Sequence, residues 1–178
     1  LIVGYSGGGK TALASNFGSN VLHLGKKVYY GTAEEPGQNI VDRFYAQALA
    51  MEYGLLHRIG NEDGEGTTQA ILDEKVKNLK RYITVNSKIG EDVDKIVEFL
   101  KYNLVIDDLK AVVPLTIETL IARLESLALK DNFIPDVVFL DQMDYLDPSI
   151  KGAGLMDQWR KLETLTLAIH KQLAPYKI

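Results

Sequence analysis

The residues with the most definite chemical potential lie close to the amino end of the sequence. The octet from Gly4 to Thr11 reads GYSGGGKT and fits the spacing G-x-x-x-x-G-K-[ST]. Glycines accept a positive φ and let successive backbone N–H groups point toward one centre, which makes a cradle for anions. A lysine and a hydroxyl at the end of the loop supply a cation and a metal ligand. The octet therefore predicts a loop that binds the phosphates of a nucleotide.

Each position of this loop has an expected role. Lys10 is expected to neutralise the β- and γ-phosphates of ATP, and the hydroxyl of Thr11 to ligate Mg²⁺. A helix that begins near Lys10 would add the positive end of its dipole. The alternative is a glycine-rich turn that precedes Lys-Thr by chance, which ordinary composition produces in about 1% or fewer of chains this long. The residues predicted to contact the nucleotide are Gly4, Ser6, Gly7, Gly8, Gly9, Lys10 and Thr11.

An aspartate far along the chain is the expected acidic partner of this loop. The apolar run from Val137 to Leu140 predicts a strand covered on both faces, and Asp141 follows it directly. A carboxylate at the end of such a strand can hold Mg²⁺ through its water shell. The alternative for Asp141 is an ordinary turn residue after a buried strand. Asp144 and Asp147 lie in the expected loop beyond it and are weaker candidates.

Hydrolysis also needs a group that orients or deprotonates water, and two adjacent glutamates are candidates for it. Glu34 and Glu35 follow the short run from Val28 to Gly31, which predicts a strand. If this strand lies beside the strand that precedes the phosphate loop, its carboxyl end faces the γ-phosphate. The alternative is that both glutamates only stabilise, through their negative charge, the first turn of a helix that starts at Pro36.

The elements that must position these residues alternate between strand and helix. Apolar runs predict strands at residues 1–3, 28–31, 82–85, 104–106 and 137–140. Apolar residues at helical spacing predict helices at residues 11–24, 36–53, 68–81, 92–102, 116–129 and 155–173. In the first of these helices, the apolar residues near one face are Ala12, Leu13, Phe17 and Val21. The alternation predicts an α/β fold with a mostly parallel sheet flanked by helices.

Length and composition limit the class of protein. The 178 residues suit one domain with a sizeable core, and 46% hydrophobic and 25% charged residues are the balance of a globular protein. The lack of cysteine excludes a disulfide framework, and three scattered histidines do not suggest a zinc site. No apolar run approaches the roughly 20 residues of a membrane span. The net charge of −4 gives no global basic surface, so any contact with nucleic acid must be local.

Both ends of the sequence resemble interrupted elements. Leu1 to Val3 read as the tail of a buried strand, and Ala174 to Ile178 as a helix exit followed by the start of another strand. We therefore expect residues 1–178 to form one domain that is truncated at both ends. No signal or transit segment is visible in the sequence.

Several segments together resemble one family. The phosphate loop, VYYGTAEEP at residues 28–36, DRF at 42–44 and VVFLDQMDYL at 137–146 resemble the RecA-like P-loop ATPase core of DnaB-type replicative helicases. LVIDD at residues 104–108 and TIETL at 116–120 resemble the strand and helix before the metal-binding strand of that family. The resemblance covers most of residues 1–58 and 104–178, and residues 159–178 fit phage members better than cellular ones.

The resemblance implies roles for three further residues. The family has a water-activating glutamate in a short motif after the strand that follows the phosphate-loop helix, and Glu34 occupies that place. Glu35 stands where the family usually has an apolar residue, so an exchange of roles between the two glutamates remains open. Arg43 matches an arginine of the next helix and is expected to contact the nucleotide.

The resemblance also implies an activity. A DnaB-like motor binds Mg²⁺-ATP between the subunits of a homo-oligomeric ring, a hexamer, and couples hydrolysis to translocation on single-stranded DNA and unwinding. Primase and other replication proteins are the implied partners, and the cytoplasm of a bacterium or a phage-infected host is the implied location. In the loop after Asp141, Lys151 is a candidate contact to DNA phosphates. An ordinary connector is an equal alternative for that loop.

The sequence departs from the family in one long segment. Residues 59–103 are longer than the usual connection and are expected to be an insertion. It includes a lysine-rich helix whose charged face is expected to be solvated, with binding of a phosphate backbone as the alternative. The polar sensor and the arginine finger of the family would lie beyond Ile178.

RecA-like recombinases and KaiC-like regulators share much of the pattern, so an ATPase in recombination or regulation is the first alternative. A nucleotide-binding assembly module with weak hydrolysis is the second, and a small-molecule kinase ranks last.

Overall fold

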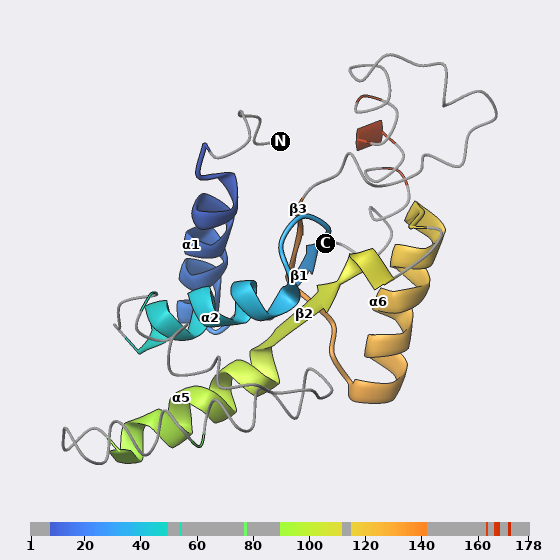
Figure 1. Cartoon of the computed structure of the whole chain (residues 1–178). Coiled ribbons are helices and arrows are strands. Elements are labelled where there is room, and N and C mark those ends of the chain that lie inside the picture. The colour runs from blue at the N-terminus through green and yellow to red at the C-terminus, as the bar shows by residue number, and fades with distance from the viewer. Residues whose placement is uncertain are drawn as a thin grey trace.

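A small parallel sheet with helices on both faces forms the described part of the chain (Figure 1). The computed structural model describes residues 8–49, 54, 77, 90–111, 115–141, 163, 166, 167 and 171. The strands are β1 Val28–Thr32, β2 Leu104–Asp108 and β3 Val137–Asp141. The helices are α1 Lys10–His23, α2 Gly37–Ala48, α5 Gly90–Asn103, the short 3-10 helix η1 Leu109–Ala111, and α6 Ile117–Asp131. This arrangement confirms the predicted α/β class with a parallel sheet flanked by helices.

The three strands run parallel in the order β2-β1-β3, with β1 in the centre. Val28 lies opposite Leu104 on one side and Val137 on the other. At the far end of β1, Thr32 lies opposite Asp108 and Asp141. The carboxyl ends of all three strands therefore reach the same edge of the sheet, which brings the polar residues after each apolar run together.

The central position of β1 bears on the role that the sequence analysis gave to Glu34. β1 is paired along its whole length with β2 at one edge and with β3 at the other. A strand has only two edges for hydrogen bonding. Both edges of β1 are therefore occupied by described strands, and the strand expected at residues 1–3 lies outside the described residues. The role of Glu34, which was expected from a direct adjacency of these two strands, stays a prediction.

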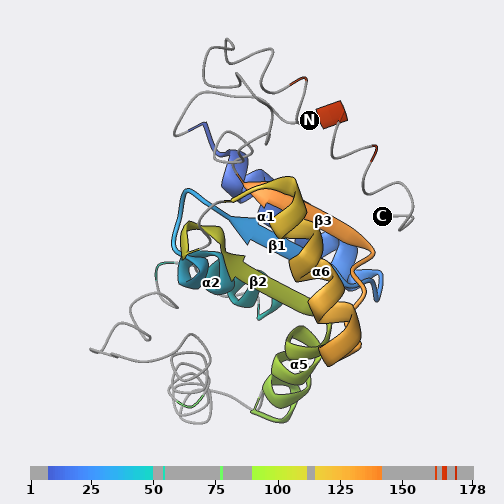
Figure 2. The same ribbon diagram turned by 90° about the vertical axis from the view of Figure 1, so that its right-hand side faces the viewer.

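The two faces of the sheet are covered by different helices (Figure 2). On one face, Val28 and Tyr30 join a core cluster with apolar residues of α1, α2 and α5. On the other face, Tyr29 packs with leucines of α6 and with Phe133. Because successive side chains of a strand point to opposite faces, two adjacent tyrosines enter two separate cores.

Part of the segment expected to be an insertion belongs to the core. α5 lies within residues 59–103, and its side chains Val93, Val97 and Leu100 are buried in the cluster shared with α2 and β1. Their spacing of four and three residues is that of one helix face. Lys77, in the expected lysine-rich helix, is helical and exposed, as predicted for a solvated face. The expected strand at residues 82–85 lies outside the described residues.

The strands and helices end at positions that differ from the predicted ones. Each strand continues beyond its apolar run, to Thr32, Asp108 and Asp141. Pairing with a neighbouring strand explains the extension, because ladder hydrogen bonds depend on the backbone and not on side-chain polarity. α2 begins at Gly37 with Pro36 as its N-cap, one residue later than predicted, and it ends at Ala48 rather than near residue 53.

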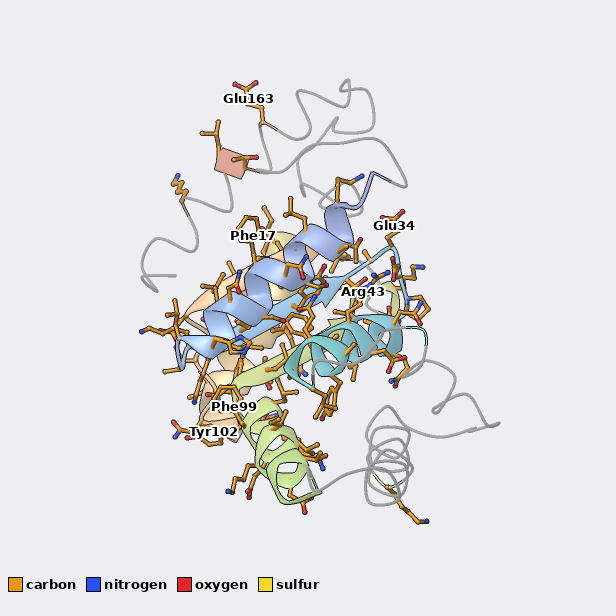
Figure 3. All side chains as sticks on the ribbon, turned by 90° about the vertical axis from the view of Figure 1, so that its left-hand side faces the viewer. Phe17, Glu34, Arg43, Phe99, Tyr102 and Glu163 are labelled. Atoms are coloured by element: carbon orange, nitrogen blue, oxygen red, sulfur yellow. The ribbon has the colours of Figure 1, made fainter. Side chains whose placement is uncertain are left out.

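α1 packs on a face made mostly of small and polar residues. Its buried residues are Thr11, Ser15, Gly18, Ser19 and Leu22. Leu13 and Phe17, from the apolar set found in the sequence, are 43% and 48% exposed, and Figure 3 shows Phe17 on the side of α1 away from α2. The Ser15 hydroxyl donates to the carbonyl oxygen of Thr11 at 2.8 Å, so this buried polar group is satisfied. The small residues allow close approach to the sheet and α2.

Gly18 is a point of close packing between α1 and α2. A Cβ added there would lie 2.7 Å from Cζ of Phe44, a fully buried ring. We expect Gly18→Val to lower the free energy of unfolding by about 2 kcal/mol, within the usual range for overpacking a core. Chemical denaturation measures this change. Ala12→Val on the exposed side of α1 is the control, expected to shift stability by less than about 0.5 kcal/mol. Equal losses in both variants would contradict the close packing at Gly18.

Candidate functional site

The candidate site lies at the carboxyl edge of the sheet, beside the first turn of α1. β1 and β3 end there with the register partners Thr32 and Asp141. α1 begins there with Lys10. Of the residues predicted to contact phosphates, the described ones are Gly8, Gly9, Lys10 and Thr11. Those outside the described residues are Gly4, Ser6 and Gly7.

The backbone at the end of the glycine run has the conformation that the motif predicts. Gly9 has φ 79° and ψ 15°, in the left-handed region, and it is the N-cap residue of α1. A residue with a side chain would be strained in this conformation, which explains a glycine here. The first turn of α1 contains no acidic side chain. The positive end of the helix dipole and Lys10 therefore act in the same direction, toward an anion at this end of the helix.

One hydrogen bond joins the two predicted metal ligands. The Thr11 hydroxyl donates to Oδ2 of Asp141 at 2.7 Å, across 130 positions of sequence. Both side chains are buried, each 8% exposed. A buried carboxylate needs donors to offset the loss of hydration, and this hydroxyl is one. The fold therefore brings Thr11 and Asp141 into direct contact, as expected for two groups that serve one ion.

The donor set of this pair fits Mg²⁺ that is shared with a nucleotide. Hydroxyl and carboxylate oxygens are hard ligands, and Mg²⁺ commonly takes one or two protein oxygens while phosphates and waters complete its octahedron. Among the described residues, no group of three or more histidines, aspartates or glutamates could hold a metal ion without such help. Thr11 and Asp141 are therefore suited to a metal that arrives with phosphate.

Tyr30, which the sequence analysis did not identify, also donates a hydrogen bond to Asp141. The Tyr30 hydroxyl donates to the same Oδ2 of Asp141 at 3.1 Å. Tyr30 is fully buried, and burial together with the negative charge of Asp141 raises the pKa of its phenol. The phenol therefore stays protonated and remains a donor. Only the pairing of β1 with β3 places Tyr30 near Asp141, so nothing local in the sequence could have identified it.

The two candidate glutamates have different surroundings. Both carboxylate oxygens of Glu35 lie 3.2 Å from Nη2 of Arg43, and the two side chains are 29% and 24% exposed. Arg43 thus pairs with a glutamate of its own chain, and its contact with nucleotide stays a prediction. In Figure 3 the side chain of Glu34 projects from the loop after β1, at the edge of the sheet where the strands end.

The backbone around Glu34 is anchored to its neighbours. Ala33 N–H donates to the carbonyl oxygen of Asp141 at 2.6 Å, and the Thr32 hydroxyl donates to the carbonyl oxygen of Glu35 at 2.8 Å. Lys110 of η1 donates from Nζ to the carbonyl oxygen of Glu34. These bonds attach the loop to β3 and to the segment after β2. The contact of Lys110 with the loop of Glu34 was not predicted either, because it depends on the pairing of β1 with β2.

Two further predictions fall wholly or mostly outside the described residues. Lys151 and the loop around it are not described, and of the predicted final helix only residues 163, 166, 167 and 171 are described, all helical. No helix in the described part of the chain has the length and apolar character needed to cross a membrane. Comparisons with protein-family models, curated proteins and solved structures found no match to this chain.

Proposed function

We propose that this chain is the catalytic core of a RecA-like ATPase that hydrolyses Mg²⁺-ATP. The observation that carries the proposal is the contact between Thr11 and Asp141. A hydroxyl directly after Gly-Lys at the start of a helix meets a carboxylate at the end of a parallel strand. Such a contact is the arrangement that a phosphate loop and its acidic partner require to hold one metal ion.

Each described residue has a definite task in this proposal. Gly9 turns the backbone so that the N-terminus of α1 faces the phosphates, and Lys10 neutralises their charge. Thr11 and Asp141 hold Mg²⁺, which when bound supplies positive charge to the phosphate oxygens. Glu34 orients or deprotonates the attacking water, while the pair of Glu35 and Arg43 fixes the start of α2. Positioning and charge supply most of the catalysis in phosphoryl transfer.

The finer proposal is a DnaB-like helicase motor that translocates on single-stranded DNA within a homo-oligomeric ring. It rests on the resemblance of the segments around β1, β2 and β3 to that family. In the structure these segments are parallel strands of one sheet, as predicted. A resemblance of this kind is an analogy at the level of fold, so the motor activity needs its own test.

The first experiment tests the binding of nucleotide. We expect Lys10→Ala to abolish tight binding of Mg²⁺-ATP and to leave the fold intact, because Lys10 is half-buried at the start of α1 and is not a core residue. Isothermal titration with an ATP analogue measures affinity, and circular dichroism checks the fold. Lys26→Ala is the matched control, since Lys26 pairs with Asp136 before β3, at the other end of the sheet. Unchanged affinity in folded Lys10→Ala would refute the phosphate-loop assignment.

The second experiment separates the motor from other RecA-like ATPases. A helicase is expected to hydrolyse ATP faster with single-stranded DNA and to separate the strands of a forked duplex. A RecA-like recombination or regulatory ATPase would show stimulation or hydrolysis without strand separation. An assembly module would bind nucleotide and hydrolyse it weakly with or without DNA. The assay uses the full chain with and without oligonucleotide.

A further inference from the structure

A single carboxylate oxygen in the candidate site accepts two hydroxyl hydrogen bonds. Oδ2 of Asp141 accepts from Thr11 at 2.7 Å and from Tyr30 at 3.1 Å. Thr11 lies in the first turn of α1, whereas Tyr30 lies in the middle of the central strand β1. The carboxylate is therefore held between a group of the proposed metal site and a group of the hydrophobic core.

The ring of Tyr30 and its hydroxyl have separate roles. The ring packs edge-on against Phe44, with centroids 5.9 Å apart, and stacks on Phe139 at 5.8 Å with an interplanar angle of 21°. A phenylalanine would make the same ring contacts and would bury no polar atom. A hydroxyl at a fully buried position costs free energy unless it is paired. Packing thus explains an aromatic residue at this position, and Asp141 explains the hydroxyl.

We propose that Tyr30 is a positioning residue that holds the carboxylate of Asp141 in the orientation needed to bind a divalent metal with Thr11. This inference rests on the proposed function, because it names how that site is tuned. A phenol that donates to a carboxylate restricts its rotation and stabilises its charged form. Groups behind a metal-binding carboxylate commonly act in this way, and their loss typically lowers metal affinity or activity about 10- to 100-fold.

The backbone explains why Tyr30 can take this role. In the register of β1 with β3, Tyr30 lies opposite Phe139, and Asp141 lies two residues farther along β3 on the same face. The long axis of a tyrosine spans this offset, so the ring contacts Phe139 while the hydroxyl reaches Asp141. Register and side-chain length together place the donor, and shorter residues at position 30 could not reach the carboxylate.

The preceding residue is a matched control. Tyr29 is also fully buried, it is adjacent in β1, and it points to the opposite face of the sheet. Burial, and after it the negative charge of Asp107, raise the pKa of the Tyr29 phenol, and Asp107 itself pairs with Arg123 at 2.6 Å. Tyr29→Phe therefore removes a buried phenol beside an aspartate that is not part of the proposed site.

The test measures metal binding directly. Mn²⁺ is titrated into the full chain with a non-hydrolysable ATP analogue, and bound Mn²⁺ is followed by electron paramagnetic resonance. We expect Tyr30→Phe to weaken Mn²⁺ binding about tenfold. Binding of the analogue in EDTA should not change, and Tyr29→Phe should bind Mn²⁺ like the wild type. Because the ring contacts survive, thermal unfolding should show both variants folded.

The outcomes distinguish this inference from the proposed function. Wild-type Mn²⁺ affinity in folded Tyr30→Phe would overturn the positioning role and leave the ATPase proposal intact. Equal weakening in Tyr29→Phe and Tyr30→Phe would also overturn it, since a general loss of packing would then be the cause. A wild-type chain that binds neither the analogue nor Mn²⁺ would overturn the proposed function, and this inference with it.

Discussion

Glu34→Gln will leave ATP affinity nearly unchanged and will lower the rate of ATP hydrolysis about 10²- to 10⁴-fold, the usual loss when a positioned general base is removed. Glutamine keeps the size of the side chain but cannot accept a proton from water. A group that acts only in the transition state contributes to the rate and not to ground-state binding. Single-turnover hydrolysis in the assembled protein, with single-stranded DNA present, measures the loss.

Glu35→Gln is the paired control for this prediction. The structure ties Glu35 to Arg43 through two contacts of 3.2 Å, in a pair that is more than two-thirds buried on each side. Its loss is expected to cost stability of about 1 kcal/mol or less and to change the hydrolysis rate much less than Glu34→Gln does. If Glu35→Gln is instead the inactive variant, the two glutamates have exchanged roles. If both variants hydrolyse ATP normally, neither glutamate is the base.

Asp141→Asn will bind nucleotide but lose hydrolysis, by about a hundredfold or more, and will change its dependence on Mg²⁺. Charge stabilisation by a bound metal is worth several kcal/mol in the transition state, and each 1.4 kcal/mol is about tenfold in rate. The amide keeps the shape of the side chain, but it has one acceptor oxygen and no charge. Its oxygen cannot replace a carboxylate that accepts from both Thr11 and Tyr30 and also serves a metal.

The measurement for this variant is the hydrolysis rate across a range of Mg²⁺ concentrations. Asp136→Asn is the control, because Asp136 precedes the same strand at its other end. The Lys27 backbone N–H and the Lys26 ammonium hold the pKa of Asp136 below its ordinary value. Its contribution to stability is therefore present above the unfolded pKa and is lost as pH falls through the folded pKa. Near neutral pH, Asp136→Asn should hydrolyse ATP at the wild-type rate. A wild-type rate in Asp141→Asn would move the metal role to Asp144 or elsewhere.

Local patterns in the sequence were enough to predict the class of fold, the glycine-rich start of α1 and the aspartate at the end of β3. Apolar runs and helical spacing are local properties, so the α/β alternation and the start of α2 after Pro36 were predictable. A glycine before Lys-Thr predicted the left-handed Gly9 at the start of α1. The acid after the run from Val137 to Leu140 identified Asp141, because an abrupt change from apolar to charged residues marks the end of a buried strand.

Local patterns could not predict which elements lie side by side. Strand order depends on contacts between segments far apart in sequence, and β1 is central because β2 and β3 pair with its two edges. This pairing brings Tyr30 to Asp141 and Lys110 to the loop of Glu34. Neither contact leaves a local signal in the sequence.

The buried face of α1 was also decided in three dimensions. Its apolar residues Leu13 and Phe17 are partly exposed, whereas Ser15 and Gly18 are buried. Hydrophobic spacing predicts a buried face only when apolar burial dominates the contact. Here close approach to Phe44 requires a residue without a Cβ at Gly18, and hydrogen bonding within the helix satisfies Ser15. The shape of the neighbouring surface, rather than hydrophobicity along the helix, therefore determines which side of α1 faces the sheet.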